Sequence, residues 1–225
     1  MKYAVITYIF GKNQEILREP SVIDKDVEYI CVTDLTDLKS NIWKIVYEPQ
    51  NEINSLRDKV ALVKFNPFKY TSAEKILIHD SSLNCIASLL PLFDNVAKYD
   101  ICLKKHPLRD NLAEELPNWK VRGLTNEQIS TFYMMAQKDK KVLTDIPLYE
   151  CCVMCIHNNE LTRTLFNSLL TLMRILGVNG NMIVTQQCPF AYLLATYYNT
   201  LHIGYIDQSK YFIRYFHNTN TINYT

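Results

Sequence analysis

Glycine is scarce in this sequence, at five residues in 225, against an average usage of roughly 7%. The five are Gly11, Gly123, Gly177, Gly180 and Gly204. Their spacing contains neither the G-x-G-x-x-G turn of dinucleotide-binding folds nor the G-x-x-x-x-G-K-[ST] phosphate loop. Two large classes of nucleotide-binding enzyme are therefore excluded.

An excess of charge of either sign is also missing. The chain has 24 Lys and Arg against 23 Asp and Glu, a formal net charge of +1. Such a balance produces no field that favours nucleic acid or an anionic membrane, so we expect no nucleic-acid partner. Composition also excludes disorder over the whole chain, because 48% of the residues are hydrophobic and only 21% are charged.

Long apolar runs and a disulfide framework are absent as well. No apolar run approaches the ~18 residues of a membrane span, and the longest candidate, 168–178, is broken by Arg174. The first ten residues lack the small-residue cleavage site of a secretory signal. Seven cysteines, an odd number scattered along the chain, argue against paired disulfides. We expect a cytoplasmic protein without a transmembrane segment.

Strand-like and helix-like segments alternate along the chain. Short apolar or β-branched runs predict strands at 2–10, 28–33, 42–47, 75–79, 100–104, 150–156 and 211–216. Helical spacing and stop signals predict helices at 53–65, 107–116, 126–136, 160–176 and 189–198. No repeat or linker divides the sequence, so we expect one domain over residues 1–225, an α/β fold around a mainly parallel sheet.

Asp80 stands at the end of the strongly apolar segment 75–79. In α/β folds, ligands bind beyond the carboxyl ends of the strands. A carboxylate at that place is suited to a divalent cation such as Mg²⁺ or Mn²⁺, or to a ribose hydroxyl. The alternative is that Asp80 only caps a helix beginning near Leu83, because Asp is a preferred N-cap residue.

A second candidate site lies where the strand 100–104 meets the next predicted helix. Four basic groups gather there: Lys104, Lys105, His106 and Arg109. Together with the partial positive charge of a helix N-terminus, they predict a cradle for a diphosphate. The alternative is a solvated helix with local ion pairs worth about 0.2–0.5 kcal/mol each.

Cysteine and histidine offer two weaker candidates. Cys152 and Cys155 form a C-x-x-C, but it lies in a strand-like run and has no second pair of zinc ligands. We expect buried core thiols there, with a thiol or zinc protein as the alternative. His217, after the late strand, either packs a sheet edge or completes a metal site from far along the chain.

A series of short motifs runs along most of the chain in a fixed order. The motifs are TYIFG at 7–11, EP at 19–20, YICVTD at 29–34, WKIV at 43–46, Arg57, KFNPFKY at 64–70, the Asp80 turn, KHPLRD at 105–110 with Glu114 and Glu115, IPLYE at 146–150, and Gln187. This series resembles a family of glycosyltransferase-like domains of bacterial polysaccharide clusters and plant cell-wall synthesis. The resemblance implies the glycosyltransferase-A superfamily and its Rossmann-like α/β domain, with helices flanking a mixed, mainly parallel sheet.

The resemblance also implies an enzyme that moves a sugar from a nucleoside-diphosphate donor to a polysaccharide or glycoconjugate acceptor. In that superfamily an Asp-x-Asp turn holds a divalent metal against the donor diphosphate, which gains negative charge as it leaves. By this resemblance, the metal, Mn²⁺ or Mg²⁺, would be held by Asp80 and His217.

The remaining roles follow from the same resemblance. Tyr8, Phe10 and Asp34 would border the nucleoside, Arg57 would help to bind the diphosphate, and Gln187 would contact substrate. Lys105, His106 and Arg109 would neutralise donor phosphate or anchor the acceptor. In an inverting reaction the base would be Glu115, with Asp110 and Glu114 as competing candidates.

Three positions depart from the family pattern. Phe68 stands where the family has a histidine, Ser82 where the turn would have its second carboxylate, and Gln186 where an aspartate is favoured. An amide or hydroxyl can neither act as a carboxylate base nor carry its charge. These departures motivate an alternative function, a non-catalytic nucleotide- or sugar-binding protein of the same fold.

Overall fold

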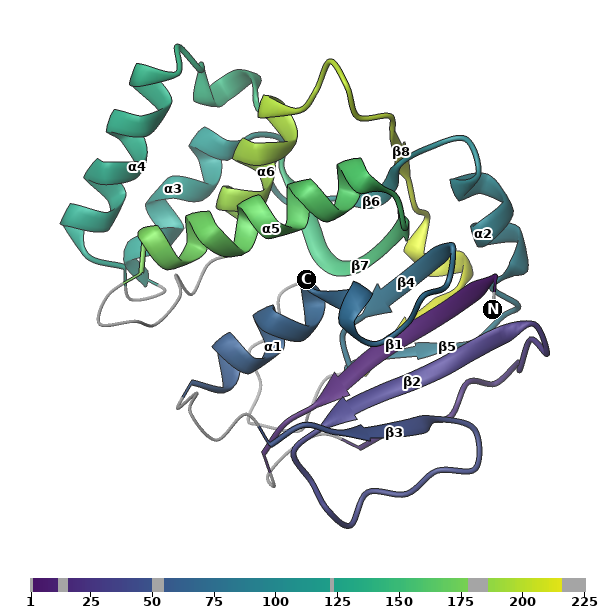
Figure 1. The fold of residues 1–225 in the computed structure, drawn as a ribbon. Helices are drawn as coiled ribbons and strands as arrows, with labels where there is room; N and C mark the ends of the chain where they lie inside the picture. Colours follow the sequence, from purple (N-terminus) through teal and green to yellow (C-terminus); the bar gives the residue numbers. More distant parts are fainter. Residues whose placement is uncertain (1, 12–15, 50–54, 122–123, 178–185, 216–225) are drawn as a thin grey trace.

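The computed structural model describes residues 2–11, 16–49, 55–121, 124–177 and 186–215. A seven-stranded sheet with the order β3-β2-β1-β4-β7-β6-β8 forms its centre (Figure 1). The strands are β1 (Tyr3–Ile9), β2 (Val27–Thr33), β3 (Lys44–Tyr47), β4 (Lys75–His79), β6 (Ile101–Lys105), β7 (Tyr149–His157) and β8 (Ile203–Tyr205). Strands β1 to β4 are parallel, and β7 runs antiparallel to its neighbours β4 and β6. The predicted mixed, mainly parallel sheet is confirmed.

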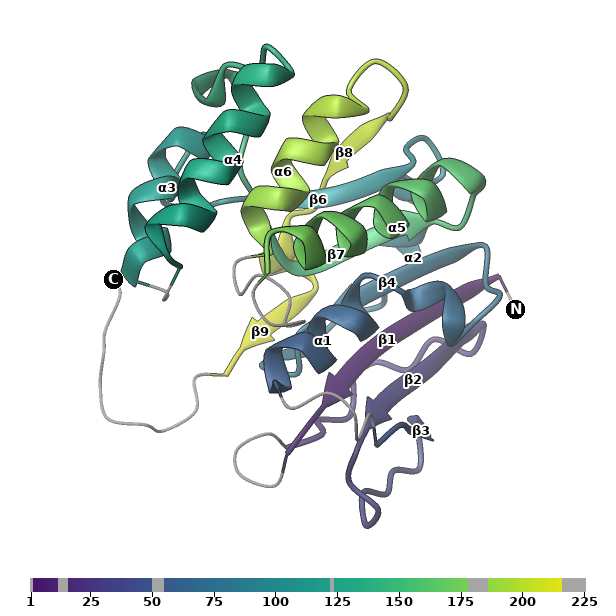
Figure 2. The same cartoon turned by 60° about the vertical axis from the view of Figure 1, so that its left-hand side comes forward.

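Helices cover both faces of this sheet. They are α1 (Leu56–Lys64), α2 (Leu90–Val96), α3 (Leu112–Val121), α4 (Asn126–Lys138), α5 (Glu160–Ile175) and α6 (Gln187–Thr196). Figure 2 shows α1, α5 and α6 on one face, and α2 contributes to the apolar cluster on the other. In the described ranges, none of the helices has the length and apolar composition needed to span a membrane.

Local signals in the sequence determine where several elements begin and end. The side chain of Ser55 accepts a hydrogen bond from the backbone N–H of Asp58 and so caps the start of α1. Helix α1 ends at Lys64, before Pro67, as predicted. Helix α5 begins with a reciprocal pair of hydrogen bonds between Asn159 and Thr162 and spans nearly the predicted range.

The segment after Asp80 differs from the prediction. Instead of a helix near Leu83, residues Leu83–Cys85 form strand β5, which pairs antiparallel with β9 (Phe212–Arg214) in a separate two-stranded sheet. The prediction that Asp80 caps a helix is therefore wrong. Local sequence could not reveal this, because β5 is stabilised by a strand from the far end of the chain.

The predicted helix 107–116 begins later than expected, with α3 starting at Leu112. The side-chain oxygen of Asn111 accepts a hydrogen bond from the backbone N–H of Glu114, and Glu114 in turn accepts one from the backbone N–H of Asp110. These reciprocal bonds satisfy N–H groups at the first turn and set the helix start after Asn111.

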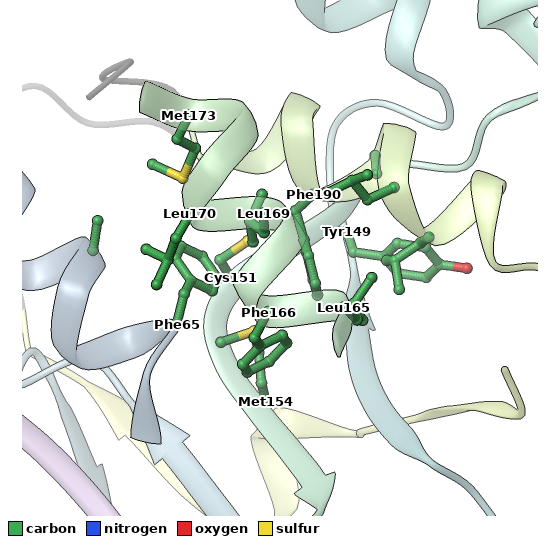
Figure 3. Packing of buried hydrophobic residues seen from close by; sticks show 14 of the residues in the cluster. Phe65, Tyr149, Cys151, Met154, Leu165, Phe166, Leu169, Leu170, Met173 and Phe190 are labelled. Atoms are coloured by element: carbon green, nitrogen blue, oxygen red, sulfur yellow. The ribbon is translucent and has the colours of Figure 1, made fainter. Parts of the chain in front are cut away.

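Aromatic side chains join three helices on one face of the sheet (Figure 3). The ring of Phe65, at the end of α1, lies 5.8 Å from that of Phe166 on α5 and 5.9 Å from that of Phe190 on α6, measured between centroids. All three rings are fully buried. This cluster positions the end of α1 and the start of α6, which both border the cavity described next.

Candidate functional site

The carboxyl ends of β1, β2 and β4 meet at one edge of the sheet, as their parallel pairing requires. Figure 2 shows the arrowheads of β1 and β2 pointing to this edge. Because β7 is antiparallel to β4, the first residues of β7 lie there too. A cavity of about 340 Å³ opens at this edge, lined by Arg57, Lys64, Asp80, Glu150, Cys151, Cys152, Gln186, Gln187 and Arg214.

Asp80 lies in this cavity, and its carboxylate already binds a cation. The ammonium of Lys64 is 2.7 Å from Oδ1 of Asp80, and the hydroxyl of Tyr8 donates a hydrogen bond to the same oxygen. The Lys64 side chain is only 6% exposed, whereas that of Asp80 is 31% exposed. Burial opposes the charged form of Lys64, but the attraction of the Asp80 carboxylate outweighs it and raises the pKa of Lys64.

The second carboxylate of the cavity, Glu150, is also paired. The ammonium of Lys104 lies 2.6 Å from Oε2 of Glu150, and the thiol of Cys152 donates to the same oxygen at 3.3 Å. Burial acts to raise the pKa of Glu150, but these bonds outweigh it and hold the pKa below its usual value. Glu150 is therefore a carboxylate that holds a lysine at neutral pH.

The cavity as a whole carries more positive than negative charge. Three basic side chains line it, those of Arg57, Lys64 and Arg214, against two acidic ones. The Nε of Arg214 is buried and has no hydrogen-bond partner among the described residues. A buried N–H without an acceptor is costly, and the residue that carries it lines the cavity.

Two glutamines complete the wall of the cavity. Gln186 and Gln187 stand where α6 begins, and both line the cavity. The first turn of a helix has free N–H groups and partial positive charge, which adds to the basic character of this wall. Gln187 and Asp80 thus line the same cavity, and the expected contact of Gln187 with substrate stays a prediction.

A second group of predicted residues lies at the same edge of the sheet. Asp34, directly after β2, accepts hydrogen bonds from the backbone N–H of Gly11 at 2.8 Å and from the ammonium of Lys59 at 3.0 Å. Burial acts to raise the pKa of Asp34, but these two bonds outweigh it and lower the pKa. Phe10 is nearly buried, at 8% exposure. Tyr8, Phe10 and Asp34 are therefore neighbours at the ends of β1 and β2.

The basic cluster after β6 is arranged around local ion pairs. The guanidinium of Arg109 lies 2.6 Å from Oε2 of the fully buried Glu115 and 3.4 Å from Nε2 of His106. The ammonium of Lys105 lies over the ring of Tyr205, 4.9 Å from its centroid. These residues are not among those that line the Asp80 cavity. Their roles in binding phosphate or acceptor stay predictions.

The three candidate bases also lie away from the Asp80 cavity. Glu115 is buried against Arg109, and Glu114 bonds to Asp110 and Asn111 at the start of α3. Asp110 lines a different cavity of about 620 Å³, together with tyrosines 149, 198 and 205. The assignment of a base among these three stays a prediction.

A divalent metal does not fit the described residues as they stand. No three His, Cys, Asp or Glu side chains gather as a cation site in the ranges that the structure describes. Oδ1 of Asp80 is held by an ammonium, and Ser82 replaces the second carboxylate of the turn. The other expected ligand, His217, lies outside the described residues.

The cysteines form no redox or zinc site in the described part of the chain. All seven are buried and unpaired as disulfides, and burial raises the pKa of Cys152 to about 12. Cys155 packs in the core of β7, as expected for a structural thiol. The expectation of buried core thiols is confirmed.

Three charged residues that line the cavity were not assigned a role from the sequence: Lys64, Glu150 and Arg214. Lys64 and Glu150 fall within recognised motifs, at 64–70 and 146–150, so a signal for them existed. Arg214 gave no such signal, because only the pairing of β9 with β5 brings it to the cavity.

Comparisons with known proteins give the same architecture. No family model matches the sequence, and no curated protein matches it. Among solved structures, the apo form of mouse xyloside xylosyltransferase 1 aligns with a TM-score of 0.50 at 9% identity, covering 93% of this chain and 86% of that one. The bifunctional glycosyltransferase WbbM aligns with a TM-score of 0.52 at 8% identity, covering 92% of this chain. The chain has a glycosyltransferase-A-like fold.

This chain spans only 39% of the WbbM chain. At 8% and 9% identity, the likeness establishes the glycosyltransferase-A-like fold and no particular substrate. The glycosyltransferase-A-like fold that the motif series implied is confirmed. The narrower family of polysaccharide-cluster proteins stays a prediction.

Proposed function

We propose that this protein is a glycosyltransferase that binds a nucleoside-diphosphate sugar in the Asp80 cavity and transfers the sugar to a saccharide acceptor. The observation that carries the proposal is the basic cavity at the strand ends, lined by Arg57, Lys64 and Arg214. It is supported by a glycosyltransferase-A-like fold, in which ligands bind beyond the carboxyl ends of the strands.

The chemistry of transfer explains why such a cavity is needed. As the bond between the anomeric carbon and the phosphate oxygen breaks, negative charge develops on the nucleoside diphosphate. Fixed positive groups in a site shielded from water stabilise that charge more in the transition state than in the ground state. In the proposal, Lys64, Arg57 and Arg214 supply these groups. Tyr8, Phe10 and Asp34, at the adjacent strand ends, border the nucleoside.

The proposal assigns the remaining substrate contacts to the predicted residues. Gln187 contacts the donor from the start of α6. Lys105, His106 and Arg109 contact the acceptor, and Glu115, Asp110 or Glu114 supplies a base in an inverting reaction. We further propose that residues 1–225 act as one domain in the cytoplasm, on a polysaccharide or glycoconjugate. The expected binding of Mn²⁺ or Mg²⁺ beside Asp80 is tested by titrating the donor both with and without a divalent metal.

Calorimetric titration with uridine and guanosine diphosphate sugars tests the donor site, with Mn²⁺ in one series and a chelator in the other. We expect binding of one donor, and at least tenfold weaker binding when Arg57 and Arg214 are both replaced by methionine. Absence of binding to every donor in both series would sink the proposal.

A second candidate function is a non-catalytic sugar- or nucleotide-binding protein. It is favoured by one observation, that both carboxylates lining the cavity are held by lysines, Asp80 by Lys64 and Glu150 by Lys104. This candidate predicts donor binding without release of nucleoside diphosphate. If the wild-type protein releases nucleoside diphosphate from a donor faster than an Asp80→Ala variant does, this second candidate function is eliminated.

A further inference from the structure

We propose that the ammonium of Lys64 occupies the place of the divalent cation in this site, so that side chains alone bind the donor diphosphate. This inference rests on the proposed donor site and specifies how that site works. It predicts a glycosyltransferase-A-like protein whose nucleotide binding needs neither Mn²⁺ nor Mg²⁺.

The first argument is the position of the ammonium. Lys64 is the last residue of α1, and its Nζ lies 2.7 Å from Oδ1 of Asp80. Tyr8 donates a hydrogen bond to the same oxygen, and its ring lies 5.6 Å from the ammonium, centroid to Nζ. Because Lys64 is almost completely buried, these contacts hold its charge at a fixed point beside the carboxylate.

The second argument is the charge of the surroundings. The cavity has two carboxylates, and each is paired with a lysine, Asp80 with Lys64 and Glu150 with Lys104. A metal ion would therefore replace an ammonium or lie next to one, against electrostatic repulsion. Ser82 offers a hydroxyl where the turn would need a second carboxylate, and hard divalent cations prefer carboxylate oxygens.

The third argument is that the lining of the cavity has more positive than negative charge. Arg57 and Arg214 add two further positive charges to its wall, and Nε of Arg214 has no acceptor among the described residues. Guanidinium groups bind phosphate oxygens with directed hydrogen bonds. Lys64, Arg57 and Arg214 thus provide positive charge for the donor diphosphate without a metal ion.

The test measures the affinity of the wild-type chain for uridine and guanosine diphosphates by calorimetry, once with EDTA and once with Mn²⁺. We expect the dissociation constants measured with EDTA and with Mn²⁺ to agree within about threefold. This difference is smaller than a tenfold change in affinity, which corresponds to about 1.4 kcal/mol. Binding that is lost in EDTA and restored by Mn²⁺ overturns this inference but leaves the proposed function intact. No binding under either condition overturns both.

Replacing the ammonium tests the assignment to Lys64 itself. Lys64→Met keeps the length of the buried stem, and we expect it to weaken binding in EDTA by about tenfold or more. Mn²⁺ should recover part of this loss, because the Asp80 carboxylate then no longer faces an ammonium. An unchanged affinity in EDTA, or a loss that Mn²⁺ does not reduce, contradicts the proposal.

Two further variants separate this result from a folding defect. Lys64→Met/Asp80→Asn removes both charges of the buried pair, and we expect it to bind weakly with or without Mn²⁺. If Mn²⁺ restored nucleotide binding in this double variant, the recovery seen in Lys64→Met could not come from a metal bound at Asp80. Lys59→Met is the matched control, because Lys59 also lies on α1 and pairs with a strand-end carboxylate, Asp34, at 3.0 Å. It should acquire no response to Mn²⁺.

Discussion

At the scale of single residues, the buried charges of the cavity determine what it can bind. Asp80 and Glu150 are each paired with a lysine, and Arg57 and Arg214 add further positive charge to the cavity, with Arg214 also attracting Glu150. A carboxylate at a strand end is thus not by itself evidence of a metal site. The partners that the fold brings to it decide its chemistry.

Arg214 provides a test of this view. We expect Arg214→Met to weaken nucleoside-diphosphate binding by about tenfold or more, the value of one hydrogen bond to a charged group. The free energy of unfolding should fall by no more than about 1 kcal/mol, because Nε has no hydrogen-bond partner among the described residues to lose and only the attraction between Arg214 and Glu150 disappears. Calorimetric titration and denaturant unfolding measure the two quantities.

The control is Arg174→Met, at an exposed position in the last turn of α5. It should leave nucleotide affinity unchanged. Equal effects of the two substitutions on affinity would show that Arg214 acts only through the net charge of the protein.

His79, beside Asp80 at the end of β4, predicts a pH dependence of stability. Burial lowers the pKa of His79 below its ordinary value of 6.5. Below about pH 6.5 the unfolded chain therefore binds a proton that the folded protein does not, so the free energy of unfolding falls as the pH falls from 6.5 toward the folded pKa. The slope from this one group is at most about 1.4 kcal/mol per pH unit.

The measurement is urea unfolding between about pH 7.5 and 5. His79→Gln should show a shallower slope than the wild type, since its side chain does not titrate. His202→Gln, at a side chain that is 81% exposed, controls for the loss of a histidine. A His79→Gln variant with the wild-type slope would contradict the assignment.

At the scale of elements, the site depends on how α1, α5 and α6 pack on the sheet. Lys64 closes α1, the two glutamines open α6, and Phe65, Phe166 and Phe190 hold these helices together (Figure 3). Two of these rings are close in sequence to cavity residues, since Phe65 follows Lys64 and Phe190 is in the first turn of α6 after Gln187. Packing in the core therefore sets the distance between the charges at the edge.

Truncation of Phe65 measures this packing. We expect Phe65→Ala to lower the free energy of unfolding by about 3–5 kcal/mol, because it leaves a cavity between three helices. Denaturant unfolding followed by circular dichroism gives the value. Phe68→Ala is the comparison, since Phe68 is only partly buried and contacts Phe166 from the periphery. A loss for Phe68→Ala as large as for Phe65→Ala would contradict the central role of Phe65.

At the scale of the whole molecule, the core encloses all seven cysteines. Burial raises the pKa of four of them, Cys85, Cys102, Cys151 and Cys152, to about 12. Only thiolates react readily with a disulfide reagent. The folded protein should therefore react slowly, although seven free thiols are present.

Titration with an aromatic disulfide reagent checks this expectation. We expect no rapid release at about pH 8 and seven equivalents after unfolding in guanidinium. Metal analysis of the same sample should find no bound zinc. A rapidly reacting pair of thiols, or stoichiometric zinc, would revive the thiol or zinc protein that the C-x-x-C motif suggested.

The sequence by itself determined the fold class and most of the elements. Short apolar runs and helical periodicity are local properties, so the strands β1 to β4, helix α5 and the strand-end position of Asp80 followed directly from them. The helix expected after Asp80 was wrong for the same reason, since β5 depends on pairing with β9. The order of motifs added the glycosyltransferase-A-like fold, which the structural comparison confirmed.

Only the tertiary structure decided which charges meet. Lys64, Glu150 and Arg214 lie far from Asp80 in sequence and come together because a parallel sheet gathers strand ends at one edge, while β7 and β9 bring later segments to it. Ion pairing depends on distances of a few ångströms, which no local pattern encodes. Sequence therefore located the edge of the proposed ligand site, and three-dimensional contacts determined that this edge presents ammonium and guanidinium groups.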